Sequence, residues 1–240
     1  MREKLIIALD VSTEAEALKL VKQLNGLAGA FKVGQQLYNY TGPDFVRKLA
    51  AAGTKVFLDL KFHDIPNTTA MAAEAATDLG VFMFNLHASG GKKMLSSAAT
   101  RAREHAAAQG MPNPLIIGVT VLTSMDETEL QVELKVSLPL EDQVASLAIL
   151  CQEAGLDGVV ASAREITRIR QECSRNFIIV TPGIRPSLAA VHDQKRTATP
   201  AEALALGADY LVIGRPVTGS ENPRDALHRI IHEITGKEGQ

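Results

Sequence analysis

The sequence has no tryptophan and few other aromatic residues, so aromatic stacking cannot dominate its core. Only 4% of its 240 residues are aromatic, whereas 46% are hydrophobic. The core must therefore be built from alanine, leucine, valine and isoleucine, which is typical of helices packed on a parallel sheet. A chain of this length suits one large α/β domain or two small ones, and single-domain barrels of this size are common.

Cysteine and excess charge are also scarce, and each shortage argues against a class of protein. Cys151 and Cys173 are isolated, with neither C-x-x-C spacing nor a neighbouring cluster of metal ligands, so we expect reduced, packed thiols. The 25 basic residues nearly balance the 27 acidic ones and form no basic block, which argues against a nucleic-acid-binding surface. An anionic ligand must therefore be held by a local group of side chains.

The N-terminal region lacks a long apolar run. The apolar residues 5–9 end at Asp10, and this run is too short for a signal peptide or a membrane span. We therefore expect a cytoplasmic protein that does not bind membranes.

What the sequence does contain is an alternation of short apolar runs with longer segments of helical periodicity, which predicts repeated βα units. No Ser/Pro-rich linker or low-complexity stretch divides the chain. Residues 1–240 are therefore expected to form one domain, a (β/α)8 TIM barrel rather than an open doubly wound sheet. The predicted strands cover residues 4–10, 30–34, 55–59, 81–86, 115–120, 158–161, 177–181 and 210–214.

Capping residues mark the predicted helices between these strands. Thr13 and Glu16 form a capping-box pattern at the start of the first helix. The longest irregular stretch, residues 120–139, is expected to hold a short helix, because Asp126 and Glu129 form an N-cap pair. Glycines are predicted to end four helices. They are Gly53, Gly80, Gly110 and Gly155.

Three charged residues alternate at the end of the third predicted strand: Asp59, Lys61 and Asp64. Side chains two positions apart on a strand share a face, so Asp59 and Lys61 should point the same way. Asp64 follows the strand, and Pro66 marks the passage into the next helix. Because burying charge is costly unless it is paired, this pattern favours a functional site over a stray ion pair.

Other charged residues also fall at the predicted carboxyl ends of strands. In barrels of this type the active site lies at those ends, and a phosphate site often forms in the loops after the seventh and eighth strands. Asp10 closes the first predicted strand and Lys32 lies in the second. Glycine lets backbone N–H groups approach an oxyanion, and arginine binds phosphate through two hydrogen bonds. The two loops carry such pairs and predict a phosphate site: Gly183 with Arg185, and Gly214 with Arg215.

Five motifs follow one another along nearly the whole chain. They are Ala8-Leu9-Asp10-Val11, Phe31-Lys32-Val33-Gly34, Asp59-x-Lys61-x-x-Asp64-Ile65-Pro66-Asn67-Thr68, Thr181-Pro182-Gly183-Ile184-Arg185 and Ile213-Gly214-Arg215-Pro216. In residues and in order they resemble the orotidine 5′-phosphate decarboxylase family. The resemblance implies decarboxylation of orotidine 5′-phosphate (OMP) to UMP, the last step of de novo pyrimidine synthesis. It also implies that the enzyme needs no metal or other cofactor and is a homodimer.

The resemblance further implies roles for individual residues. Lys32, Asp59, Lys61 and Asp64 would form a tetrad of charges, with Asp64 and Thr68 reaching in from the other subunit. The implied substrate contacts are the ribose for Asp10 and Lys32, the pyrimidine for Thr123, and the phosphate region for Pro182, Arg185, Gln194, Gly214 and Arg215. Thr120 and Ser124 remain alternatives to Thr123. Gln194 lies in the polar segment 186–197, which we expect to be a mobile lid.

The chemistry of decarboxylation is consistent with this role for Lys61. Loss of CO₂ from C6 of the pyrimidine leaves a carbanion in the ring plane, out of conjugation with the ring carbonyls, so a fixed cation is the obvious means of stabilising it. Lys61 stands between two carboxylates, which favour its ammonium form. We therefore expect Lys61 to stabilise the carbanion and then to donate a proton to C6.

Two alternatives remain open. Metal-dependent enzymes on the same scaffold, such as 3-keto-L-gulonate 6-phosphate decarboxylase and hexulose-6-phosphate synthase, resemble the chain in the D-x-K-x-x-D block. Those enzymes carry an acidic residue in place of Lys32, where a lysine would repel Mg²⁺. The other alternative is a non-catalytic binder of phosphate ligands, which would not need a buried tetrad of charges. His228 and His232 lack the rest of a metal-binding pattern, so we expect them on a solvated helix face.

Overall fold

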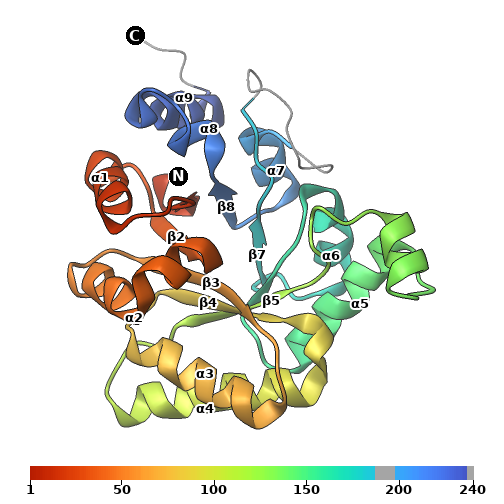
Figure 1. Ribbon diagram of the computed structural model, residues 1–240. Coiled ribbons are helices and arrows are strands. Elements are labelled where there is room, and N and C mark those ends of the chain that lie inside the picture. Colours follow the sequence, from red (N-terminus) through yellow and green to blue (C-terminus); the bar gives the residue numbers. More distant parts are fainter. Residues whose placement is uncertain (187–197, 237–240) are drawn as a thin grey trace.

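The short apolar runs pair in parallel and close into a barrel of eight strands (Figure 1). The computed structural model describes residues 1–186 and 198–236. Strands that are adjacent in the sequence are adjacent in the barrel, and the first strand closes on the last. The strands are β1 (Leu5–Ala8), β2 (Ala30–Gly34), β3 (Val56–Phe62), β4 (Met83–His87), β5 (Leu115–Val119), β6 (Gly158–Val160), β7 (Ile178–Thr181) and β8 (Tyr210–Ile213). The predicted TIM barrel is confirmed.

Helices cover the outer face of the barrel, and α3 and α4 lie side by side (Figure 1). The helices are α1 (Glu14–Leu24), α2 (Gln35–Ala51), α3 (Pro66–Asp78), α4 (Gly91–Ala108), α5 (Leu140–Glu153), α6 (Ile166–Glu172), α7 (Pro200–Leu206), α8 (Arg215–Thr218) and α9 (Pro223–Thr235). Short helical turns are η1 (Arg2–Lys4), η2 (Ala88–Gly90), η3 (Glu129–Glu133) and η4 (Ala163–Glu165).

The predicted helix boundaries are confirmed by their hydrogen bonds and backbone angles. The Glu16 N–H donates to Thr13 Oγ1, and the Thr13 N–H donates to Glu16 Oε2. Asp126 and Glu129 exchange the same pair of bonds ahead of η3, so the long loop after β5 does hold a short helix. The four predicted stop glycines all have positive φ, as the left-handed end of a helix requires.

The barrel interior is apolar at its amino end and charged at its carboxyl end. Alternate residues along each strand point inward, and the inward positions are filled mainly by small and branched side chains. The buried cluster inside the barrel contains Ile6, Ala8, Ala30, Phe57, Met83, Ile117, Val180 and Val212. Two residues beyond Ala30 and Phe57, the chain places Lys32 and Asp59. The charged side chains therefore lie directly above the apolar cluster, at the carboxyl end of the barrel.

Asp209 joins two strands at the amino end of the barrel. It stands immediately before β8, and its Oδ2 accepts the Ile179 N–H of β7 at 2.8 Å and the Arg170 guanidinium at 2.6 Å. Asp157, immediately before β6, makes the corresponding contacts with the start of β5 and with Arg103. These aspartates fix the strand register at the end of the barrel opposite the charged residues.

Two features of the described residues bear on the expectations drawn from composition. Cys151 and Cys173 are free and buried. Burial raises the pKa of the Cys151 thiol to about 12, so this thiol is protonated and unreactive at neutral pH. Within 1–186 and 198–236, no helix is long and apolar enough to cross a membrane.

Candidate active site

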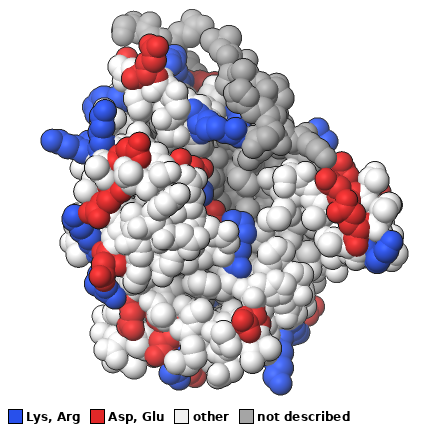
Figure 2. All heavy atoms as spheres, in the orientation of Figure 1, with Lys and Arg blue, Asp and Glu red and all other residues white. Residues whose placement is uncertain are grey.

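A hollow opens at the carboxyl ends of the barrel strands, with a cavity volume of about 150 Å³. In Figure 2 charged atoms lie beside a hollow in this face, and most of the surrounding residues are uncharged. The residues that line it come from several strands and loops: Lys32, Phe57, Asp59, Lys61, Val119, Val121, Leu122, Thr123, Val160, Pro182 and Val212.

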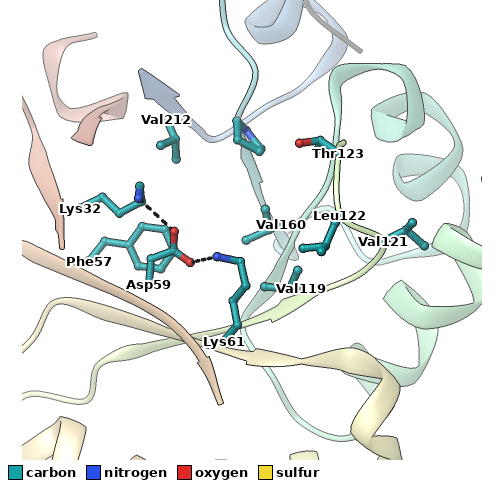
Figure 3. A pocket seen from close by; sticks show the side chains of 11 residues that line it. Lys32, Phe57, Asp59, Lys61, Val119, Val121, Leu122, Thr123, Val160 and Val212 are labelled. Atoms are coloured by element: carbon teal, nitrogen blue, oxygen red, sulfur yellow. Dashed lines mark hydrogen bonds and ion pairs between the residues drawn. The ribbon is translucent and has the colours of Figure 1, made fainter. Parts of the chain in front are cut away.

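Alternating charges form a connected row along one side of this hollow. Lys32 Nζ lies 3.2 Å from Asp10 Oδ1 and 3.1 Å from Asp59 Oδ2. Lys61 Nζ lies 2.7 Å from Asp59 Oδ1. Figure 3 shows the two ammonium groups reaching different oxygens of the Asp59 carboxylate. The prediction that Asp59 and Lys61 point the same way is confirmed.

The pKa values of Asp59 and Lys32 are shifted so that both side chains stay ionised at neutral pH. Burial alone would raise the pKa of the Asp59 carboxyl, but Lys32, Lys61 and the hydrogen bonds from Lys61 and Asn85 hold it below its usual value of 3.8. Burial alone would lower the pKa of Lys32, but Asp59 and Asp10 raise it above 10.5. The hollow therefore presents fixed charges in a largely apolar wall, where electrostatic interactions are strong.

β3 is irregular where it carries Lys61. Its ladder with β4 steps from the pair Leu58–Phe84 to the pair Phe62–Leu86, so three residues of β3 lie opposite one of β4. Lys61 has a φ of 54°, in the left-handed region that costs a non-glycine residue about 1–2 kcal/mol. Because the strand continues past this bulge, the predicted end two residues before Lys61 was wrong. Strained backbone of this kind is often found at functional sites.

Asn85 of β4 belongs to this arrangement, although the sequence analysis did not select it. It is 1% exposed; its Nδ2 donates to Asp59 Oδ1 at 2.7 Å and its Oδ1 accepts the Lys61 N–H at 2.7 Å. The available signal was a polar residue inside the apolar run 83–86, with the same strand parity as the buried Met83. A buried amide of this kind needs partners, and here both partners belong to the charged row.

Asp10, the other end of the row, lies just beyond β1. The first strand was predicted to reach Asp10, but it ends at Ala8. Asp10 is half exposed and its carboxylate lies close to the backbone of Gly214, where an added Cβ would be 3.5 Å from Asp10 Oδ2. This places the end of β8 beside the row of charges.

Asp64 and Thr68 do not line the hollow of their own chain, as far as its described lining shows. Asp64 is exposed, and its Oδ1 accepts the N–H of Ile65 at 2.6 Å. Thr68 is exposed in the first turn of α3. Within this chain, therefore, Lys32, Asp59 and Lys61 meet, and the described contacts of Asp64 do not reach them.

Thr123, which was predicted to contact the pyrimidine, lines the hollow from the loop after β5. Thr120, one of its alternatives, is 2% exposed and donates its hydroxyl to the Val160 carbonyl at 2.9 Å. Ser124 is not part of the described lining. The geometry therefore favours Thr123 over both alternatives for contact with a ligand.

The residues predicted to bind phosphate are placed only in part. Pro182 lines the hollow, and Arg185 follows it in a loop where the Arg185 N–H donates to the Ala198 carbonyl at 2.9 Å. Arg215 begins α8 directly after β8. Neither arginine is among the described residues lining the hollow. Gln194, with most of the predicted lid, lies outside the described residues.

His63 and His87 form a stacked pair beside the row, with ring centroids 5.3 Å apart. Ser89 Oγ lies 2.9 Å from His87 Nδ1. Burial, together with His63 and Lys61, lowers the pKa of His87, so its ring is neutral at neutral pH. His228 and His232 lie at the opposite end of the chain on α9, beside the N-terminal residues. Among the residues described, no group of three or more potential metal-binding side chains is present.

Comparison with known proteins places this architecture in a family. Residues 3–230 match the model of the "Orotidine 5'-phosphate decarboxylase / HUMPS family". A protein of Syntrophotalea carbinolica named orotidine 5′-phosphate decarboxylase is 54% identical over 97% of this chain and 95% of its own length. One of the same name from Moorella thermoacetica is 53% identical, over 97% and 92% of the two chains. The crystal structure of orotidine 5′-phosphate decarboxylase from Lactobacillus acidophilus superimposes with a TM-score of 0.85 at 36% identity, covering 96% of this chain and 98% of the other. The chain belongs to the orotidine 5′-phosphate decarboxylase / HUMPS family.

Proposed function

We propose that this chain decarboxylates OMP to UMP in pyrimidine biosynthesis, with no metal or other cofactor, and that Lys61 is the proton donor. The observation that carries the proposal is the row of ammonium and carboxylate groups at the mouth of the barrel. Similarity over nearly the whole chain to proteins named orotidine 5′-phosphate decarboxylase supports the same activity.

Lys61 supplies the fixed cation and the proton that this reaction needs. When CO₂ leaves C6, the electron pair stays in the ring plane and cannot be delocalised into the ring carbonyls. A fixed ammonium stabilises that pair while it forms and then transfers a proton to it, which completes UMP. Asp59 holds the Lys61 ammonium at 2.7 Å, so the cation is in place before the substrate binds.

Asp59 has a second effect, on the departing carboxylate. Two like charges about 4 Å apart repel by about 4 kcal/mol at an effective dielectric constant near 20. Enzymes generally lower a barrier by about 8–23 kcal/mol. Repulsion of the substrate carboxylate is therefore too small to explain catalysis alone, and we assign the larger share to the preorganised charges around the carbanion.

The phosphate provides binding energy at a distance from the reacting carbon. Arg215 and Arg185, together with Gln194, are the groups that we assign to it, and Asp10 and Lys32 are assigned to the ribose. Binding energy from a remote group can be used to order the reacting end of a substrate. Thr123 and Pro182 line the hollow where the pyrimidine would lie.

We further propose that the enzyme is a homodimer in which Asp64 and Thr68 complete the site of the partner subunit. Both residues are exposed and lie outside the described lining of their own hollow. Ile65, between them, is 66% exposed, and Met71 on the same helix is 48% exposed. These apolar side chains are accessible for contact with a partner subunit.

A metal-dependent reaction is the second candidate, because the family name also includes HUMPS. The position of Lys32 argues against it: its ammonium lies 3.2 Å from Asp10 and 3.1 Å from Asp59, between the two carboxylates that would otherwise attract a divalent cation. An ammonium in that position repels the cation.

A spectrophotometric assay of OMP consumption separates these functions. The purified protein should consume OMP and form UMP at the same rate before and after treatment with EDTA. Activity that EDTA removes and Mg²⁺ restores would support the metal-dependent alternative. Binding of UMP without any consumption of OMP would support a non-catalytic phosphate-ligand binder.

A further inference from the structure

Asn85 occupies a place where an apolar residue would be expected. It lies on β4 inside the barrel, two residues beyond Met83, and both are almost completely buried. A buried amide is costly unless its donor and acceptor are both used. Asn85 uses them on two groups of β3: its Nδ2 donates to Asp59 Oδ1, and its Oδ1 accepts the Lys61 N–H, each at 2.7 Å.

The bulge in β3 explains why a side chain is needed there. Where three residues of β3 lie opposite Asn85 alone, the regular ladder of backbone hydrogen bonds is interrupted. The Lys61 N–H is bonded to the Asn85 side chain instead, at the residue whose φ is 54°. On the other side of the bulge, the Gln35 side chain donates to the Leu60 carbonyl at 3.2 Å. Asn85 therefore stabilises the backbone conformation of Lys61, which determines the direction in which the Lys61 side chain points.

The same amide also fixes the carboxylate that orients Lys61. Asp59 Oδ1 receives both Asn85 Nδ2 and Lys61 Nζ, and its Oδ2 faces Lys32. The hydrogen bond from Asn85 Nδ2 restricts rotation of the Asp59 carboxylate, so Oδ1 stays toward Lys61 and Oδ2 toward Lys32. A neutral amide is suited to this task, because it donates to the carboxylate without adding a charge to the row.

We propose that Asn85 is a positioning residue of the decarboxylase, which aims the Lys61 ammonium and the Asp59 carboxylate at the reacting carbon of the substrate. The inference rests on the proposed function. Among the interactions described, Asn85 bonds only to the Asp59 carboxylate and to the Lys61 backbone N–H, both at the reacting end of the site and not at the phosphate end. Loss of the amide should therefore reduce turnover far more than it reduces nucleotide binding.

The test compares Asn85→Leu, which is similar in size but apolar, and the smaller Asn85→Ser with the control Met83→Ala. Met83 faces the same interior on the same strand, has no part in the lining of the hollow, and leaves a cavity when truncated. For each protein, kcat and KM for OMP, the Kd for UMP and the melting temperature are measured. UMP keeps the phosphate and the ring but lacks the carboxylate.

Misplacement of a catalytic group by about 1 Å can cost about 100-fold in rate, so Asn85→Leu should lower kcat by about 100-fold and change the Kd for UMP by less than about threefold. Asn85→Ser should show a smaller loss in the same direction, and it carries the test if the leucine variant does not fold. Met83→Ala should have a lower melting temperature but an unchanged kcat when it is assayed below its unfolding transition. Folded Asn85 variants that keep kcat, or that raise KM and Kd together at unchanged kcat, would overturn the proposal.

Hydrogen exchange gives a readout that does not depend on activity. The Lys61 amide should exchange faster in Asn85→Leu and in Asn85→Ser than in the unmodified protein, whereas Met83→Ala should leave its relative protection unchanged. Unchanged exchange in both Asn85 variants would also overturn the proposal. If the unmodified chain does not consume OMP, the proposed function fails, and the exchange result then decides separately whether Asn85 holds Lys61.

Discussion

The two lysines of the charged row differ in their access to a ligand. The side chain of Lys32 is 12% exposed and its ammonium contacts two carboxylates, whereas the side chain of Lys61 is 30% exposed and contacts Asp59. Lys61 is therefore the better placed of the two to reach a substrate in the hollow. Lys32 bridges Asp10 and Asp59 and keeps the pKa of the Asp59 carboxyl low.

Replacing Lys61 with alanine should abolish turnover without unfolding the protein. General acid catalysis contributes about 10²–10⁴-fold and electrostatic stabilisation about 10²–10³-fold, so we expect kcat to fall by about 10⁴-fold or more. The matched control is Lys92→Ala, whose ammonium pairs with Glu153 on the exposed surface and should be nearly silent. Decarboxylation by Lys61→Ala at close to the unmodified rate would exclude Lys61 as the proton donor.

The lowered pKa of Asp59 predicts how stability depends on pH. Since the folded state holds this pKa below 3.8, ionised Asp59 stabilises the fold fully above pH 3.8, and that contribution is lost as pH falls toward the folded pKa. The difference in unfolding free energy between the unmodified protein and Asp59→Asn should be constant from pH 5 to pH 7 and decrease below pH 3.8. Urea unfolding at a series of pH values measures it. If the difference in unfolding free energy increased on acidification, the pKa of Asp59 in the folded protein would be raised instead of lowered.

At the scale of elements, the sequence predicted the strands well and the local geometry of β3 poorly. Strand positions follow from apolar runs and their punctuation, and these signals are contained in the sequence of each segment. The bulge at Lys61 depends on a contact with Asn85, 24 residues further along the chain. A positive φ at a lysine has no local sequence signal, because the partner that stabilises it lies on another strand. The proximity of Asp59 and Lys61 was predicted correctly, because alternation along a strand is a local signal. The end of the strand was predicted wrongly, because it depends on the contact with another strand.

The amino end of the barrel offers a test of stability separate from activity. Asp209→Ala removes the acceptor of hydrogen bonds from the Ile179 N–H and from the Arg170 guanidinium, so we expect a loss of about 1.5–3 kcal/mol in unfolding free energy. Asp209→Asn keeps an acceptor and should lose less. Asp44→Ala, which breaks an exposed pair with Arg47, should cost less than about 1 kcal/mol. Urea unfolding gives these values, and an Asp209→Ala protein as stable as Asp44→Ala would contradict the proposed bracing of β7 and β8.

The start of α8 is predicted to bind the substrate phosphate through Arg215. Hydrogen bonds to charged groups contribute about 1.5–3 kcal/mol, so Arg215→Ala should lower kcat/KM for OMP by about 10- to 100-fold. Orotidine, which lacks the phosphate, should be turned over equally by the unmodified protein and by the variant. Arg47→Ala serves as the control for loss of a surface guanidinium. Equal damage to both substrates would assign Arg215 to something other than the phosphate.

At the scale of the whole molecule, the proposed dimer explains why one barrel brings together only part of the predicted tetrad. Asp10, Lys32, Asp59 and Lys61 are joined by contacts of 3.2 Å or less. Asp64 is only three residues beyond Lys61, yet it is exposed and hydrogen-bonded to its own helix start. A second subunit whose α3 approaches this hollow would supply the missing carboxylate. The exposed Ile65 beside Asp64 gives such an approach an apolar contact.

Mixing two inactive variants tests this arrangement directly. Lys61→Ala and Asp64→Ala homodimers should each be nearly inactive, because every site lacks one residue. If Asp64 acts across the interface, a heterodimer has one site with both residues intact and one site with neither. Since random exchange of equal amounts makes half of the dimers heterodimers, activity should rise to about one quarter of that of the unmodified protein. If Asp64 acts within its own chain, every site in the mixture still lacks one residue and activity stays near zero. Native mass spectrometry confirms that heterodimers form, and their presence without recovered activity would rule out the shared site.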